Sequence, residues 1–348
     1  MRTPQPRGPV SEALLDLLHG PSGQDGLPDD LVSAALGATS DLLHDEDLQL
    51  ALYCLYELHY RGFDDVDDRW EWDPGLLASR ALIEADLERV LRERATPPSG
   101  VEPTAAAVAA ALFALTAPGK PGLASYVAKR ADAAQLEELL VHRSVYQLKE
   151  ADPHTWAIPR LDGAPKAALV EIQADEYGGG DPERMHAALF ARTMRGLGLD
   201  DSYGRYVDHV PAITLASVNT MSLFGLHRRL RGAIVGHLAA FEMTSSTPNQ
   251  LYGNGFRRLG HDEGTTWYFD EHVEADAVHE QIAGRDLAGG LAQQDPALLP
   301  DIMFGAAACL LLDDLAGSHL MGAWTRGESA LRSPIDPSRT PAHAGSGA

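Results

Sequence analysis

The sequence predicts an all-α protein, and three observations support this prediction. Ala and Leu dominate the 45% of the 348 residues that are hydrophobic, whereas aromatic residues make up only 7%. Such a composition favours helices over sheets. Apolar residues recur three and four positions apart, which is the spacing of a helix face. Helix start and stop signals, such as Asp181-Pro182 after three glycines, separate the segments.

Residues 1–94 are predicted to form an N-terminal helical region. Residues 1–9 are rich in Pro and Arg, and we expect them to be flexible. The predicted helices that follow contain no clustered metal ligands. Their recurring Leu, Tyr and Ala positions therefore indicate a layer of helix packing. The three prolines of residues 95–104 indicate a linker. The predicted helices of this region are 11–20, 29–45, 46–63 and 76–95.

Residues 105–317 are predicted to form a second helical domain. We expect a loop at 152–160, and a break at 247–255, where the sequence TPNQLYGNG is rich in turn residues. From residue 318 the chain becomes polar and Pro-rich, so we expect residues 318–348 to be disordered. The predicted helices are 104–116, 120–131, 133–152, 164–177, 182–198, 211–225, 227–246, one around His272, and 296–316.

Charge and cysteine content exclude several classes of protein. A net charge of -22 argues against binding to nucleic acid and to anionic membranes, since both need basic surfaces. Cys54 and Cys309 are too few and too far apart to predict a disulfide framework or a thiolate metal site. The N-terminus lacks the apolar run of a signal peptide, and no stretch reaches transmembrane length. We therefore expect a cytoplasmic protein.

The segment EHVEADAVHE contains the most informative pattern. His272, Asp276 and His279 follow one another at spacings of four and three, which places them within about 60° on one face of a helix. Phe269 and Ile282 continue the same face, so the three polar groups occupy positions that normally hold core residues. Burial there is costly unless something, typically a metal, satisfies the polar groups. The alternative is a solvated polar face on an acidic surface helix.

Two glutamates also lie on apolar helix faces. Glu242 shares a stripe with Val235 and Leu238, and a carboxylate so embedded is expected to be neutral or metal-bound. Glu176 continues a stripe through Leu169 and Ile172, whereas Glu171 and Asp175 fall on the opposite face, which we expect to be wet. Glu242 could instead be an N-capping or hydrogen-bonded core glutamate.

Three further residues complete the candidate set. His186 has the apolar neighbours Met185 and Leu189, and Glu183 stands three residues before it in the ExxH spacing known from di-iron helix bundles. Glu183 could equally complement the helix dipole, and His186 could be a core histidine. Glu150 is a second-tier candidate that could be a surface residue. A di-iron site needs about four carboxylates and two or three histidines from several helices.

With this ordered set, the chain resembles the heme-oxygenase-like di-iron oxidases, which are iron-containing redox enzymes. The segments that carry the resemblance are HRSVYQLKEADPH, VEIQADEYGGG with RMH, FEMTS and DEHVEADAVHE. The resemblance implies a heme-oxygenase-like seven-helix bundle, preceded by a dimerisation region at 1–94, that holds two irons instead of heme. The implied metal ligands are Glu176, His186, Glu242, His272, Asp276 and His279, with Glu150 as an additional carboxylate and Glu183 as second tier.

The resemblance also implies an activity. Family members activate O2 through a peroxo-di-iron intermediate, with an external reductant or electron donor protein. The similarity to the N-oxygenating branch implies that an amine of a small amino-acid-like or heterocyclic substrate is oxidised in secondary metabolism by a homodimer. A multidomain relative continues into a cupin domain with its own iron, so we expect this chain to stop at the oxidation of its substrate.

Other functions remain open on the same scaffold. Relatives cleave C–C bonds, as in the decarboxylation of a fatty acid or the fragmentation of an amino acid. A heme-degrading enzyme is disfavoured by the carboxylates around His272 and His279. A non-catalytic helical ligand-binding protein would not need all six ligands. Manganese suits the same oxygen and nitrogen ligands as iron.

Overall fold

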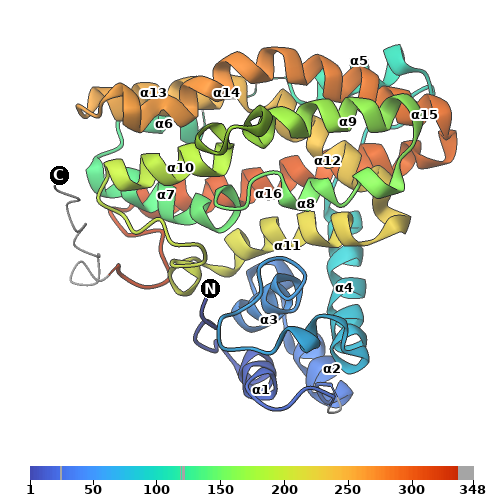
Figure 1. Cartoon of the computed structure of the whole chain (residues 1–348), viewed down its shortest axis with the longest axis vertical. Helices are drawn as coiled ribbons and strands as arrows, with labels where there is room; N and C mark the ends of the chain where they lie inside the picture. Colours follow the sequence, from blue (N-terminus) through green and yellow to red (C-terminus); the bar gives the residue numbers. More distant parts are fainter. Residues whose placement is uncertain (24–25, 118, 120–121, 336–348) are drawn as a thin grey trace.

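The helical prediction is confirmed by the computed structural model, which describes residues 1–23, 26–117, 119 and 122–335, with only the backbone of residues 274–277. Every regular element in these ranges is a helix, and the ranges contain no strand. The helices α1 (Pro9–Leu18), α2 (Asp29–Ala38) and α3 (Glu46–Glu57) lie on one side of α11 (Ala212–Leu226), α4 (Pro74–Arg94) extends past α11, and the remaining helices form a bundle on its other side (Figure 1). No helix of the described ranges has the length and apolar character needed to cross a membrane.

The N-terminal region is built around α3 (Glu46–Glu57). Its first turn is capped by Asp45, whose carboxylate accepts hydrogen bonds from the backbone N–H groups of Asp47 and Leu48. Every residue from Leu48 to Glu57 is buried, because α3 packs against α11 as well as against its own region. The other helices of this region are α1 (Pro9–Leu18), α2 (Asp29–Ala38) and α4 (Pro74–Arg94).

A segment without helix separates α4 from α5 (Ala105–Leu115), where the sequence predicts a linker. The two parts of the chain are nevertheless in contact beyond this segment. Arg92 of α4 forms an ion pair of 2.9 Å with Asp301 and lies over the ring of Phe304, 4.1 Å from its centroid. The division into a dimerisation region and a catalytic domain stays a prediction.

The bundle is held together by close helix crossings. Gly236 in α12 and Gly305 in α16 lie against each other's helices, and a Cβ on either would clash with the backbone carbonyl of Ile302 or Ala233. Glycine is therefore required for this approach. The bundle helices are α6 (Leu123–Lys129), α7 (Ala133–Gln147), α8 (Asp152–Thr155), α9 (Gly163–Glu176), α10 (His186–Gly196), α12 (Arg231–Met243), α13 (Ser246–Arg258), α14 (Glu263–Gln281), a π-helical stretch (Ile282–Gly289), α15 (Gly290–Gln294) and α16 (Leu299–Thr325).

The predicted break at 247–255 is wrong, because these residues belong to α13. The glycines that suggested a turn serve helix packing instead. A Cβ on Gly255 would lie 2.7 Å from the carbonyl oxygen of Val127, so α13 packs directly against α6. Tyr252 and Phe256 are buried in the same helix. Tertiary packing overrides a poor helix propensity here.

The predicted disorder from residue 318 is also wrong for the residues that are described. Helix α16 continues to Thr325, and Trp324 is buried with its Nε1–H donating to Glu138 at 2.8 Å. Beyond the helix, the backbone N–H of Arg332 donates to the carbonyl of His209 at 2.8 Å. The polar composition of this segment gives no indication of these contacts. Residues 336–348 lie outside the described residues.

Candidate metal centre

Five segments bring carboxylates and imidazoles to one place inside the bundle. Glu176 is the last residue of α9 and His186 is the first of α10. Between them, three glycines at residues 178–180 adopt φ values from 60° to 93°, which reverse the chain so that the two side chains meet. Glu150 follows α7, Glu242 lies at the end of α12, and α14, which packs along α10 in Figure 1, carries the other two histidines.

The first group of ligand atoms comes from Glu176, Glu242 and His279. One atom of each lies within 4.8 Å of the other two, and all three side chains are buried. Nδ1 of His279 is 3.5 Å from Oε2 of Glu242. These residues are 37 or more positions apart in the sequence, so the group exists only in the folded bundle.

The second group consists of Glu150, His186 and His272, which meet the same 4.8 Å condition and are also buried. Nε2 of His272 lies 3.4 Å from Oε1 of Glu150. The two groups adjoin each other, because Nδ1 of His186 is 3.0 Å from Oε2 of Glu176. Together they form one buried centre of six candidate ligands.

Hydrogen bonds outside the centre orient its histidines. Nδ1 of His272 lies 2.7 Å from the carbonyl oxygen of Tyr268, which can only accept, so Nδ1 carries the proton and Nε2 faces Glu150. The hydroxyl of Tyr268 donates to Oε1 of Glu150 at 2.9 Å. Nε2 of His279 lies 3.0 Å from Oδ2 of Asp175, so its Nδ1 faces Glu242. Metal-binding histidines commonly have such outer partners.

The electrostatics of the centre show that its carboxylates attract positive charge. Burial raises the pKa of Glu176, but the charge and contact of His186 outweigh burial and hold it at about 2. Burial, with the nearby charge of Glu176, raises the pKa of Glu242. Burial lowers the pKa of His279, yet the contacts with Glu242 and Asp175 prevail and raise it to about 9. Without a metal, the centre therefore holds protons between its carboxylates.

The residues present fit an iron site. Oε2 of Glu150 is fully buried and makes no hydrogen bond to any described residue. A buried polar atom without a partner is costly. A cation bound between the two ligand groups would provide the missing partner. Carboxylate oxygens with imidazole nitrogens are the mixed ligand set that iron(II) accepts.

The structure thus brings together five of the first-tier candidates and the second-tier Glu150. The sixth, Asp276, belongs to residues 274–277, whose side chains lie outside the described residues. Glu183 is not part of the centre: its carboxylate is 80% exposed and pairs with Arg192 at 3.6 Å. The ExxH spacing fails because residues Pro182–Arg184 form a 3-10 turn and the α-helix begins only at His186.

Sequence reasoning missed two residues. Asp175 was expected on a wet face, and it is indeed 62% exposed, but it bonds His279. Tyr268 was not singled out, although it precedes His272 by four residues, the spacing at which side chains share a helix face. For Asp175 no local signal exists, since its partner is 104 residues away.

A small cavity adjoins the centre. Its volume is about 10 Å³, close to the least that holds one water molecule. Four candidate ligands line it, namely Glu150, Glu176, Glu242 and His272, and the remainder of its wall mixes polar and apolar residues. The other lining residues are Tyr146, Ala151, His154, Gln173, Leu238, Phe241 and Ser245.

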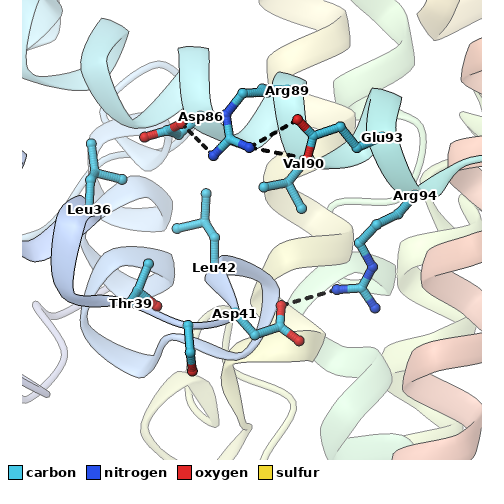
Figure 2. Close-up of a pocket in the computed structure, with 10 residues that line it drawn as sticks. Leu36, Thr39, Asp41, Leu42, Asp86, Arg89, Val90, Glu93 and Arg94 are labelled. Atoms are coloured by element: carbon cyan, nitrogen blue, oxygen red, sulfur yellow. Dashed lines mark hydrogen bonds and ion pairs between the residues drawn. The ribbon is translucent and has the colours of Figure 1, made fainter.

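A second pocket, of about 320 Å³, lies in the N-terminal region between α2, α4 and the turn after α2. Figure 2 shows that its arginines already have partners: Arg89 bonds to Asp86 and Glu93, and Arg94 bonds to Asp41. Because these cations are neutralised within the wall, the pocket offers little to an anionic ligand.

Comparisons with known proteins agree with this chemistry. The family model described as iron-containing redox enzyme matches residues 137–314, just over half of the chain. Nitrosourea synthase of Streptomyces achromogenes subsp. streptozoticus is 24% identical over 193 residues, which cover 55% of this chain and 41% of that protein. The chain thus spans less than half of the relative's length. With an all-α, heme-oxygenase-like fold and buried His/Glu clusters that suit iron, the chain belongs to the family of iron-containing redox enzymes and is an oxidoreductase.

Proposed function

We propose that this protein is an O2-dependent non-heme di-iron oxidase that N-oxygenates an amine of a small polar substrate. One observation carries the di-iron proposal: two buried groups of three ligand atoms adjoin through the 3.0 Å contact between His186 and Glu176. Carboxylates that lie between two such groups are the elements that hold two metals close together. Two bound irons would supply the redox chemistry that O2 needs.

The protein's own residues would prepare the centre for this chemistry. Tyr268 and Asp175 hold the rings of His272 and His279 in the orientation that directs one nitrogen of each to the centre. Burial of all six candidate ligands excludes bulk water, which strengthens every electrostatic interaction inside. The shared position of Glu176 allows one carboxylate to serve both groups.

Two observations support an amine in preference to a fatty acid. The cavity beside the centre is small and its wall includes Tyr146, His154 and Gln173, whereas a fatty acid needs a long apolar channel. The similarity to a nitrosourea synthase also favours chemistry at nitrogen. Conversion of an amine to a hydroxylamine consumes one O2, two electrons and two protons and releases water. An external reductant would supply the electrons. We further propose a homodimer, formed through residues 1–94.

Anaerobic titration with ferrous iron, followed by rapid mixing with O2, tests the proposal. We expect about two irons per chain and a change in the visible absorbance after mixing with O2. His279→Ala should lose iron, whereas Glu183→Ala, a matched control on the exposed ExxH position, should bind like the wild type. Failure of the wild type to bind iron would leave a helical ligand-binding protein as the better account. Oxidation of an aliphatic acid in preference to amines would favour C–C cleavage.

A further inference from the structure

Three side-chain atoms around the cavity beside the centre make no hydrogen bond to any described residue. They are Oε2 of Glu150, Oε1 of Gln173 and Nδ1 of His154, and each is fully buried. All three residues line the cavity, whose volume of about 10 Å³ suits a single water molecule. Since buried polar atoms are nearly always paired in native proteins, three such atoms around one small cavity indicate a shared partner.

The surroundings of Gln173 determine which atom of its side chain is available. Its Nε2 donates to the carbonyl of Ala151 at 3.3 Å, which leaves Oε1, an atom that can only accept. Ala151 directly follows Glu150 and has a φ of 74°, a left-handed conformation that is uncommon for a residue with a side chain. Strained backbone of this kind concentrates at functional sites. Gln173 therefore supports the turn that carries Glu150 and presents an acceptor beside it.

The imidazole of His154 can donate a hydrogen bond to the cavity. Burial lowers the pKa of His154 to about 4, so the ring is neutral at pH 7 and carries one proton. Its Nε2 lies 3.1 Å from Nδ1 of His237, whose pKa is also lowered by burial. If His237 donates through Nδ1, then Nε2 of His154 accepts and its proton resides on Nδ1, the atom without a described partner.

One water molecule matches the hydrogen bonding of all three atoms. Oε2 of Glu150 and Oε1 of Gln173 would each accept one of its two protons, and Nδ1–H of His154 would donate to its oxygen. Buried waters typically make about three hydrogen bonds of this kind. A carboxylate oxygen has two lone pairs, so Oε2 of Glu150 can accept from the water and still bind a cation. The water and a metal therefore do not compete for this oxygen.

We propose that the cavity is a site for one water molecule, held by Gln173 and His154, which orients the carboxylate of Glu150 toward the metal centre. The orienting role rests on the proposed function, whereas the water site does not. Tyr268 already donates to Oε1 of Glu150 at 2.9 Å, so a water on Oε2 would fix the rotation of the carboxylate from its other side. Outer partners of metal ligands strengthen metal binding. Gln173 and His154 are thus positioning residues that act on Glu150 through the water.

A high-resolution crystal structure and NMR spectra of the metal-free protein test the water site. We expect one water molecule within about 3.2 Å of Oε2 of Glu150, Oε1 of Gln173 and Nδ1 of His154. The ¹⁵N spectrum should show the proton of His154 on Nδ1. A proton on Nε2 would contradict the arrangement, because one water cannot donate to three acceptors. An ammonium ion of similar size could do so, and it would require that tautomer.

Two variants test the orienting role by ferrous titration. Gln173→Met keeps the volume and removes the acceptor, while Thr155 still donates to the carbonyl of Ala151 at 3.2 Å. The occupancy of the water should fall, and the affinity for ferrous iron should weaken about 10–100-fold. His154→Gln, which keeps an atom near the Nε2 position and removes Nδ1, should have the same two effects.

A matched control separates this role from a loss of stability. The buried amide of Gln49, in the N-terminal region, donates to the carbonyl of Leu42 at 2.9 Å and accepts from Asn219 at 2.8 Å. Gln49→Met should therefore lower the melting temperature at least as much as Gln173→Met, and it should leave the water and the iron affinity unchanged. Weaker iron binding in both variants would show that lost stability, and not the water, is the cause.

The outcomes distinguish this inference from the proposed function. If wild-type crystals show no water in the cavity while the protein takes up two irons, the water site is wrong and the di-iron proposal stands. If the water is lost in Gln173→Met but the iron affinity equals that of the wild type, the water does not orient Glu150. If the wild type contains the water and takes up no iron, the proposed function and the orienting role both fail, whereas the water site is confirmed.

Discussion

Two buried clusters of charged residues lie next to each other in this molecule, and they differ in how their charges are satisfied. The Lys149 cluster consists of Glu57, Lys149, Tyr53, Tyr60 and Tyr203. Lys149 and Glu57 are 1% and 0% exposed and pair at 3.1 Å across the junction of α3 and the bundle. The hydroxyl of Tyr203 also bonds Glu57, at 2.7 Å, and Tyr60 places its ring 4.1 Å from the ammonium.

The metal centre begins one residue later, at Glu150, and is balanced differently. The Lys149 cluster matches one anion with one cation. The centre instead places Glu150, Glu176 and Glu242 against imidazoles and the hydroxyl of Tyr268, and it leaves Oε2 of Glu150 without a hydrogen bond to the described residues. A cluster that satisfies itself holds the fold together, whereas an unbalanced one identifies the place where a ligand or metal binds.

The largest expected effect is on the balanced cluster. Lys149→Met leaves the carboxylate of Glu57 buried without its cation, so the free energy of unfolding should fall by about 3–5 kcal/mol. Urea denaturation measures this change. Lys149→Met combined with Glu57→Gln removes both charges and should recover most of the loss. A single variant as stable as the wild type would show that the pair does not hold the two regions together.

The unbalanced cluster should respond in the opposite way. Glu242→Gln keeps the shape of the side chain and an acceptor oxygen for His279, so the unfolding free energy of the metal-free protein should fall by only about 1–2 kcal/mol, less than for Lys149→Met. Iron affinity should fall by more than the roughly 100-fold that follows loss of an outer partner. Ferrous titration of the variant checks the affinity. A large loss of metal-free stability with unchanged iron binding would contradict the comparison.

Asp175 should have an intermediate effect that appears only with metal. Asp175→Ala removes the partner of His279 Nε2, and such losses weaken metal affinity about 10–100-fold. Because the carboxylate is 62% exposed, metal-free stability should hardly change. Glu171→Ala, an exposed residue on the same helix, is the matched control and should bind iron normally. Equal iron affinities for both variants would remove Asp175 from the site.

The smallest expected effect concerns His142, a histidine outside both clusters. Burial, with the nearby His319, lowers the pKa of His142 to about 3, and its Nδ1 is bonded to Thr214 at 2.7 Å. The unfolded chain takes up this proton below about pH 6.5 and the folded chain does not, so stability present above pH 6.5 is lost as the pH falls toward 3. At pH 5.5 the loss is about 1 kcal/mol. His142→Asn should flatten this part of the stability profile in urea titrations.

The sequence predicts those features of the centre that follow from helix periodicity. Glu176, Glu242, His272 and His279 each lie on an apolar stripe of one helix, so their burial follows from local spacing. Their convergence from separate helices does not follow from spacing, and it was expected only through resemblance to a family. As metal ligands all of them remain predictions, and so does Asp276.

The errors have physical causes of their own. The prediction of Glu183 as a candidate ligand was wrong because a 3-10 turn precedes the helix of His186. The residues at the start of the helix do not indicate this difference. The helix at Ser246–Arg258 was missed because its glycines serve a close contact with α6 and not a turn. The pair of Glu57 and Lys149 spans 92 positions, so no local pattern can indicate it. The all-α class needed only composition and periodicity, and it was correct.

The adjacency of Lys149 and Glu150 has a consequence for how this protein can evolve. A segment such as residues 95–104, without helix and rich in proline, is where recombination would exchange one N-terminal region for another. An exchange there would separate Glu57 from Lys149 and disturb the turn that presents Glu150. A hybrid of two relatives should therefore keep the buried pair beside Glu150 only when both parents carry Glu and Lys at these two positions.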